Sequence, residues 1–183
     1  MGYPGQGCIK MLIDCSKFYR FFFVLVLLVL PQITLAGQYQ VSRVIDGDTI
    51  EVKKGATKII VRLVGVDAPE ASRKKHEPGQ PYSQQAIQHL NKLVLNRTVD
   101  VKTFGTDRYG RALSEVFVGG NNINLDMVRA GFAEAYRGTP APGHNMAPYR
   151  QAEEEARKAG RGMWVLGDSY VSPKEYRRMN HPR

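Results

Sequence analysis

Apolar residues in the middle of the chain fall in short alternating or continuous runs that predict β-strands. The first three runs, 38–45, 49–53 and 58–66, are separated by two short turns, so we expect an antiparallel meander. The third run is the richest in β-branched residues and predicts a largely buried strand. Two later runs, 97–104 and 112–118, predict two further strands.

Helical periodicity appears between and after these strands. Ser83 is placed to cap a helix with an apolar stripe at helical spacing. Asn124 is expected to cap a short helix, and a later helix with Pro148 in its first turn is expected to end near Lys158. After Asp168 the residues are polar and basic, which predicts a loosely ordered tail.

Five short strands with a central helix and C-terminal helices predict an α+β, β-rich fold. The expected architecture is a five-stranded OB-fold Greek-key barrel with about three α-helices. We divide the chain into an N-terminal leader (1–36), one folded domain (37–166) and a basic C-terminal tail (167–183).

The N-terminal segment predicts a secretory signal peptide. The apolar run Phe21–Leu30 follows three basic residues, and small residues precede Gly37. Cleavage would make the protein secreted or periplasmic. The alternative is an uncleaved leader that anchors the protein in a membrane, although the run is shorter than the about 20 apolar residues that span a bilayer.

Charge and cysteine content narrow the choice of partners and sites. The chain has 26 Lys and Arg against 17 Asp and Glu, with a pI near 9.7. This excess favours polyanionic partners such as nucleic acid, although it is equally consistent with a need for solubility alone. Both cysteines, Cys8 and Cys15, lie in the leader, so a cleaved chain has no cysteine for a disulfide or a zinc site.

Carboxylates lie at the ends of the predicted strands. Asp46 and Asp48 flank Gly47, while Asp67 and Glu70 follow the third apolar run. Each pair alone could be an ordinary turn, because Asp-Gly is a common hairpin sequence. Their oxygens suit Ca²⁺ or Mg²⁺ better than zinc.

Two arginines complete the candidate site. Arg62 lies inside an apolar run, where a guanidinium must be paired or face a polar pocket, because burying it unpaired is costly. Arg111 lies beside a turn and, taken singly, could be a surface residue. A metal, a carboxylate base and two arginines are suited to phosphodiester cleavage. The histidines are scattered and predict surface or helix-lining roles.

Three segments in order, IDGDT, VRLVGVDAPE and TDRYGRAL, resemble the staphylococcal nuclease-like (thermonuclease) family. The resemblance covers roughly Tyr39 to Trp164 and implies an OB-fold barrel with helices for the domain 37–166. One departure is Ala68, where the family often has Thr; the ligand there is a backbone carbonyl, so the resemblance leaves coordination possible.

The resemblance also implies a role for each candidate residue. It implies that Asp48 and Asp67 bind Ca²⁺, that Asp46 lies behind them and reaches the metal through water, and that Glu70 is the general base. The positions that match phosphate-binding or substrate-contacting residues are Arg62, Arg111, Arg108, Tyr109 and, less closely, Tyr136.

Together with the leader, the resemblance implies a secreted, Ca²⁺-dependent endonuclease. It would hydrolyse phosphodiester bonds of DNA and RNA without strong sequence preference and leave 3′-phosphate ends. A monomer without a stable protein partner is expected. The alternative is a catalytically weak OB-fold module that binds nucleic acid or protein, because members of this fold can lose catalysis and keep binding.

Overall fold

The computed structural model describes residues 1–2, 37–72 and 78–180. The chain divides into two units, Met1–Leu35 and Ala36–Arg183, and the helices and strands given below belong to the second. Apart from Met1 and Gly2, the predicted leader lies outside the described residues. Within the described part of the chain, no helix is long and apolar enough to cross a membrane.

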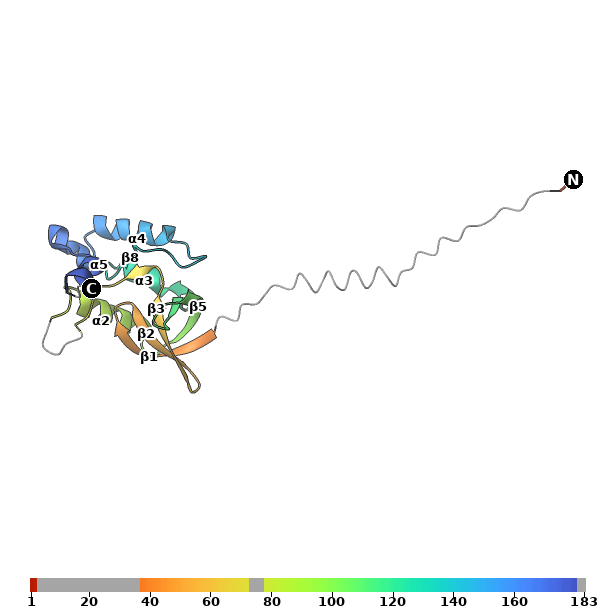
Figure 1. The fold of residues 1–183 in the computed structure, drawn as a ribbon, viewed down its shortest axis with the longest axis horizontal. Helices are drawn as coiled ribbons and strands as arrows, with labels where there is room; N and C mark the ends of the chain where they lie inside the picture. The colour runs from red at the N-terminus through yellow and green to blue at the C-terminus, as the bar shows by residue number, and fades with distance from the viewer. Residues whose placement is uncertain (3–36, 73–77, 181–183) are drawn as a thin grey trace. The chain divides into compact units, whose positions relative to one another are not determined.

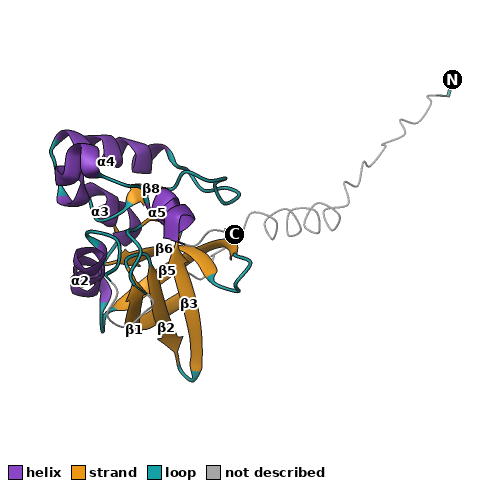
Figure 2. Cartoon of the chain, turned by 60° about the vertical axis from the view of Figure 1, so that its left-hand side comes forward, coloured by secondary structure: helices purple, strands orange, loops and turns teal. Residues whose placement is uncertain are grey.

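Five strands close into a barrel. They are β1 (Gly37–Asp46), β2 (Thr49–Lys54), β3 (Thr57–Leu63), β5 (Thr98–Thr106) and β6 (Ala112–Val118). Neighbours in the order β3-β2-β1-β5-β6 pair antiparallel, and a parallel pairing of β3 with β6 closes the sheet. The short strand β7 (Asn121–Asn122) pairs antiparallel with β6, while β4 (Val66–Asp67) pairs with β8 (Glu134–Ala135) in a separate ladder. The predicted α+β barrel is confirmed (Figure 2).

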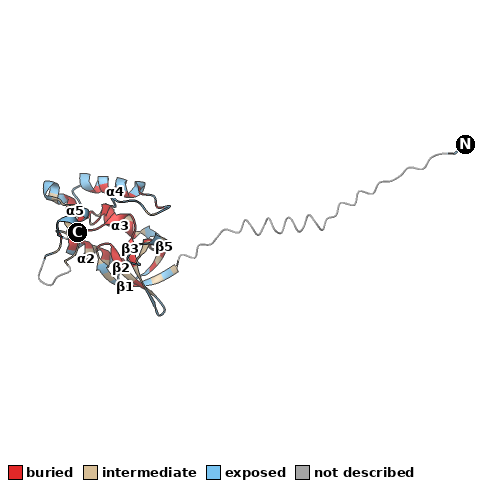
Figure 3. Cartoon of the chain, in the orientation of Figure 1, coloured by how far each residue is buried: buried red, intermediate tan, exposed pale blue. Residues whose placement is uncertain are grey.

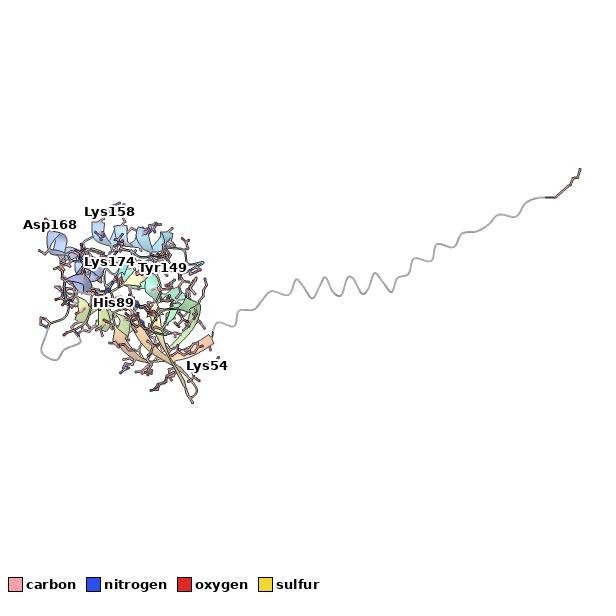
Figure 4. The ribbon with its side chains drawn as sticks, viewed as in Figure 1. Lys54, His89, Tyr149, Lys158, Asp168 and Lys174 are labelled. Atoms are coloured by element: carbon pink, nitrogen blue, oxygen red, sulfur yellow. The ribbon has the colours of Figure 1, made fainter. Side chains whose placement is uncertain are left out.

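The helices form a layer beside the barrel. They are α2 (Ser83–Val94), α3 (Ile123–Arg129), α4 (Ala147–Lys158), the 3₁₀ segment η1 (Gly162–Ser169) and α5 (Pro173–Asn180). α3 lies between the barrel and α4, and α2 packs beside β1 (Figures 1 and 2). Pro148 lies in the first turn of α4, as predicted. Tyr149 of α4 and His89 of α2 are labelled in Figure 4.

The core lies where the barrel interior meets α2 and α3. The inward β-branched positions of the strands are buried, and the outer faces of α4 and α5 are exposed (Figure 3). Each fully buried aliphatic side chain contributes about 1.5 to 3 kcal/mol, so this shared core holds the barrel rim in one shape. Its central members include Val41, Ile50, Val61, Leu90 and Met127.

Two predicted helix caps are wrong by one or two positions. Ser83 is the first helical residue of α2, and Tyr82 occupies the cap position with φ 70° and no side-chain hydrogen bond. The cap of α3 is Asn122, whose side chain accepts a hydrogen bond from the Leu125 amide. For α3 the capping residue is of the predicted type, an Asn two positions earlier, whereas α2 begins without a side-chain cap.

Asn124 has a different task from the predicted one. Its side chain is fully buried and donates to the carbonyls of Val64 and Ser114, both at 2.9 Å. Its carbonyl oxygen accepts from the Val116 amide at 3.0 Å. Asn124 therefore ties the connection between β3 and β4 to β6, which fixes the chain just before Asp67.

The prediction of a loosely ordered tail is wrong for α5. Ser172 and Glu175 form a capping box: the Glu175 amide donates to Ser172 Oγ at 3.2 Å, and the Ser172 amide donates to Glu175 Oε2 at 3.4 Å. Pro173 follows at the first helical position, where its fixed φ suits the helix. The four residues Ser-Pro-Lys-Glu are thus a local signal for the start of a helix within a segment of basic composition. Residues 181–183 lie outside the described part.

Candidate active site

One pocket of about 790 Å³ opens at the rim of the barrel. It is bounded by the turn between β1 and β2, by β3, and by the loops around residues 107–111 and 136–146. All of the sequence-predicted site residues except Asp67 line it: Asp46, Asp48, Arg62, Glu70, Arg108, Tyr109, Arg111 and Tyr136. Asp67 is 2% exposed and bonds to two arginines of this pocket, Arg62 and Arg177.

The turn between β1 and β2 packs tightly against the segment that contains Asp67. A Cβ at Gly47 would lie 2.8 Å from Ala68 Cβ and 2.9 Å from Ala86 Cβ, so a larger residue would push these elements apart. The Ala68 amide donates to Asp48 Oδ2 at 3.0 Å across this contact. Glycine between the two acids therefore allows Asp48 and the Asp67 segment to meet.

Arg62 joins the two predicted metal ligands. Its side chain is 16% exposed and forms an ion pair with Asp48, and its Nη2 donates to Asp67 Oδ1 at 2.9 Å. Burial alone would lower the pKa of Arg62, but the carboxylates of Asp48 and Asp67 outweigh it and raise the pKa. A guanidinium inside an apolar strand is thus paired, as its burial requires.

The acids concentrate negative charge in a poorly hydrated place. Burial, together with the nearby Asp48 and Glu70 carboxylates, raises the pKa of Asp46 to about 6. Hard carboxylate oxygens under mutual repulsion are a donor set that fits a divalent cation such as Ca²⁺ or Mg²⁺. Within residues 1–2, 37–72 and 78–180, no group of three or more Asp, Glu, His or Cys is already arranged as a metal cage.

Glu70 is held where the chain leaves β4. The Gln80 amide donates to the Glu70 carbonyl at 2.8 Å, and the Glu70 amide donates to Gln80 Oε1 at 3.1 Å. A Cβ at Gly79 would lie 2.8 Å from the same Glu70 carbonyl, so the two ends of this loop touch closely. The backbone of Glu70 is therefore fixed, and its carboxylate faces the pocket.

Asp107 organises the loop that presents Arg111, and it was not among the predicted site residues. Its Oδ1 accepts from the amides of Tyr109 and Arg111 at 2.9 and 3.0 Å, and its Oδ2 accepts from Arg111 Nε at 2.7 Å. Burial opposes ionisation, but these hydrogen bonds prevail and lower the pKa of Asp107. Aspartate that bonds the amide two residues later is a known turn device, so the Asp-Arg-Tyr order was an available signal.

Aromatic rings lie at the mouth of the pocket. Tyr109 is 68% exposed, with the guanidinium of Arg108 over its ring and Arg108 Nη2 donating to its hydroxyl at 2.7 Å. Tyr136 is 38% exposed, and its amide donates to the Gly65 carbonyl at 2.9 Å. Exposed rings beside cations are suited to stacking on bases.

Arg177 of α5 reaches the same acids from the far end of the chain. Its Nη1 and Nη2 donate to the two oxygens of Asp67 at 3.0 and 2.7 Å, and Nη1 also donates to Glu70 Oε1 at 2.5 Å. The bond to Asp67 raises the pKa of Arg177, although partial burial works against it. The sequence does not single out this residue, because it lies in the segment predicted to be a loosely ordered tail.

His144 is buried in the wall of the pocket. It is buried against Gly65 and the rings of Phe104 and Tyr149, and it lines the pocket. Glu115 Oε1 lies 3.4 Å from its Nε2, but neither ring nitrogen has hydrogen-bond geometry to any partner in the described residues. The prediction of a surface or helix-lining role is wrong for this histidine.

Comparison with known proteins supports one family. The family model described as Staphylococcal nuclease homologue matches residues 60–165. The probable endonuclease LCL3 of Clavispora lusitaniae is 36% identical over 126 residues, covering 66% of this chain and 54% of that protein. An uncharacterized endonuclease of Escherichia coli is 39% identical over 131 residues, covering 70% of this chain and 78% of that protein.

Another protein named as an endonuclease, from Haemophilus influenzae, is 36% identical over 140 residues, which is 76% of this chain and 72% of the relative. The chain spans about half the length of the LCL3 proteins that it matches. The matched segment contains the end of β3 from Ile60, the Asp67 to Glu70 turn and the Arg111 loop.

Proposed function

Because the chain belongs to the staphylococcal nuclease homologue family, we propose that it is a metal-dependent endonuclease that hydrolyses phosphodiester bonds of DNA and RNA. Ca²⁺ is the cation we propose. The products would carry 3′-phosphate ends, and the attack would be independent of base sequence.

One observation supports the proposal above the others: a single pocket brings together carboxylates, arginines and exposed aromatic rings. Asp46, Asp48 and Glu70 line it together with Arg62 and Arg111. A phosphodiester is an anion with a flat base beside it, so it needs a cationic wall, an aromatic mouth and an acid to accept a proton from water. A pocket for a neutral small molecule would not need this combination of charged groups.

The side chains have separate tasks in the proposed reaction. Glu70 accepts the proton of the attacking water, since its carboxylate faces the pocket and its backbone is fixed by Gln80. Arg62 and Arg111 stabilise the charge that develops on the phosphate oxygens. Tyr109 offers its exposed ring to a base of locally single-stranded substrate.

Asp48 and Asp67 would hold the divalent cation, and Asp46 would support it from behind. When bound, such a cation supplies Lewis-acid stabilisation of the phosphate and lowers the pKa of bound water. The chemistry of the donors fits this task, because each is a hard carboxylate oxygen, and burial followed by the nearby Asp48 carboxylate raises the pKa of Asp46.

Digestion of plasmid DNA and of RNA with Ca²⁺, with Mg²⁺ and with EDTA tests the proposal. We expect cleavage with Ca²⁺ that EDTA abolishes, and loss of about 10²-fold or more in rate for Glu70→Gln with substrate binding retained. Glu154→Gln, an exposed glutamate of α4, is the matched control and should cleave like the wild type. Nucleic-acid binding without cleavage under every metal would favour the binding-module alternative instead.

We also propose that the protein is exported through its N-terminal leader, because the apolar run with preceding basic residues has signal-peptide character. Mass measurement of the protein purified from its native cells distinguishes the two fates of the leader: a mature chain that begins near Gly37 means cleavage, and a full-length chain in the membrane fraction means anchoring.

A further inference from the structure

The C-terminal helix α5 places a guanidinium on two acids of the proposed active site. Arg177 lies more than a hundred positions from both partners along the chain, yet it engages both oxygens of Asp67 and one oxygen of Glu70. The Asp67 contact is bidentate, which is the strongest arrangement of an arginine with a carboxylate. The predicted metal ligand and the predicted base are therefore occupied by one side chain.

Both oxygens of Asp67 are committed. Oδ2 accepts from Arg177 Nη2 at 2.7 Å, while Oδ1 accepts from Arg62 Nη2 at 2.9 Å and from Arg177 Nη1 at 3.0 Å. Since Asp67 is only 2% exposed, its oxygens cannot be reached from the solvent by another route. A cation could reach Asp67 only after the Arg177 guanidinium has moved away.

α5 itself is weakly packed. Of its eight residues, all of them described, Pro173 alone is buried. The Arg177 side chain is 36% exposed, and its ion pairs are the polar contacts that α5 makes with the acids of the pocket. A helix that contacts the pocket acids through one side chain and buries little apolar area has low local stability, so it can open without unfolding the rest of the domain.

The chain just before α5 is anchored much more firmly. The Tyr170 hydroxyl donates to Glu134 Oε2 at 2.7 Å, and Gln80 Nε2 donates to the Val171 carbonyl at 2.7 Å. Trp164 packs against Tyr170 with ring centroids 4.5 Å apart, and Arg157 lies over the Trp164 ring. Release of α5 would therefore begin after Val171 and leave the rest of the C-terminal segment in place.

We propose that α5 is an autoinhibitory latch: docked α5 keeps Arg177 on Asp67 and Glu70, and a divalent cation must displace it to reach these acids. The inference rests on the proposed metal-dependent nuclease function and adds its regulation. A divalent cation carries more charge than one guanidinium, so a sufficient cation concentration opens the latch. The protein would then be active where the free cation is plentiful and silent where it is scarce.

Calcium binding without nucleic acid measures the latch directly. Isothermal titration of Ca²⁺ is compared for the wild type, Arg177→Gln and Arg178→Gln; the last removes the same charge from an exposed position of the same helix. If α5 is docked at least nine-tenths of the time, Arg177→Gln lowers the apparent Kd for Ca²⁺ at least about tenfold. Arg178→Gln leaves the Kd unchanged.

Amide hydrogen exchange of α5 provides the second readout. In the wild type, Ca²⁺ is expected to increase exchange in α5 and leave exchange at Tyr170 and Val171 unchanged. In Arg177→Gln, α5 exchanges rapidly even without Ca²⁺. Arg177→Lys retains the charge but loses the two-pronged contact, so it gives intermediate behaviour and checks that Arg177→Gln has not simply failed to fold.

The outcomes separate this inference from the proposed function. Equal Ca²⁺ affinity in the wild type and Arg177→Gln, or unchanged α5 protection on Ca²⁺ addition, overturns the latch even if both proteins cleave DNA. Unchanged Ca²⁺ affinity with weakened nucleic-acid binding in Arg177→Gln also overturns it and makes Arg177 a substrate contact. If Arg177→Gln binds Ca²⁺ more tightly but neither protein cleaves, the latch stands and the nuclease proposal fails.

Discussion

Arg62 Nη2 donates to Asp67 Oδ1 at 2.9 Å, and the two side chains are only 16% and 3% exposed. The same guanidinium is paired with Asp48. A charge in such a place is tolerated because its partner is present, and removal of one partner from a buried pair costs far more than the pair contributes. Arg62 is thus needed for stability before any substrate arrives.

Substitution of Arg62 by Gln is expected to lower the free energy of unfolding by about 3 kcal/mol, because buried Asp48 loses its ion pair and Asp67 keeps only Arg177. Saturating Ca²⁺ should restore part of this loss, since it binds the folded acids and not the unfolded chain. Urea unfolding followed by Trp164 fluorescence, with Ca²⁺ and with EDTA, measures both effects.

Arg43→Gln is the control for this experiment. Arg43 is an arginine of β1 whose side chain is 65% exposed, with Glu51 at 3.8 Å, so its loss should change stability by less than about 0.5 kcal/mol. Equal stability of the two variants would mean that the buried acids do not need the Arg62 cation.

The barrel could be predicted from local patterns, because the order of apolar and polar residues in each strand indicates which of its positions are buried. The β-branched run around Arg62 predicts a buried strand, and one charge inside that run requires a partner nearby, which the structure provides in Asp48 and Asp67. Turn acids such as Asp46 could be found in the same way, since Gly47 marks the turn between two strands.

The contacts of Arg177 and His144 could not be predicted, because they join residues that are far apart in the sequence. Arg177 meets Asp67 across 110 positions, and nothing in a basic segment tells which of its arginines will turn inward. His144 lies in a Pro- and Gly-rich stretch without periodicity, so its burial depends on Gly65 and Phe104 rather than on its neighbours in sequence. Long-range pairing of this kind is decided by the assembled fold.

Asp107→Asn should weaken catalysis without unfolding the protein. The amide oxygen of Asn can still accept the turn hydrogen bonds from Tyr109 and Arg111, but the ionic contact to Arg111 Nε at 2.7 Å is lost. We expect kcat/KM to fall about tenfold, the equivalent of one charge-assisted hydrogen bond. Steady-state cleavage of a fluorescent oligonucleotide measures this, and thermal unfolding verifies the fold.

Asp168→Asn is the matched control, because Asp168 is exposed and does not line the pocket (Figure 4). It should leave kcat/KM unchanged. Wild-type kcat/KM in Asp107→Asn would mean that Arg111 finds its orientation without Asp107.

His144 should make the protein less stable as the pH falls through the weakly acidic range. Burial lowers the pKa of His144 from 6.5, with a smaller contribution from Lys102 of β5, while Glu115 of β6 acts in the opposite direction. Tyr149 of α4 covers the ring and stays neutral in this range, because burial raises its pKa. Folded His144 therefore resists protonation at a pH where the unfolded chain already binds a proton.

The direction of the pH dependence of stability follows from the lower pKa of His144 in the folded state. Where the unfolded state binds more protons, the free energy of unfolding rises with pH, so stability is present above about pH 6.5 and is lost as the pH falls below it. One such group adds a slope of up to about 1.4 kcal/mol per pH unit between its folded and unfolded pKa values. Urea unfolding at a series of pH values gives the slope.

His144→Leu removes the titrating group and keeps an apolar side chain between Phe104 and Tyr149. The difference in the free energy of unfolding between the wild type and the variant reports on His144 alone, because His89, whose pKa is also lowered by burial, titrates in both proteins. We expect the difference in stability to change with pH only below about pH 6.5, in favour of the variant as acid is added. A difference that is constant across the series would show that His144 titrates alike in the folded and unfolded states.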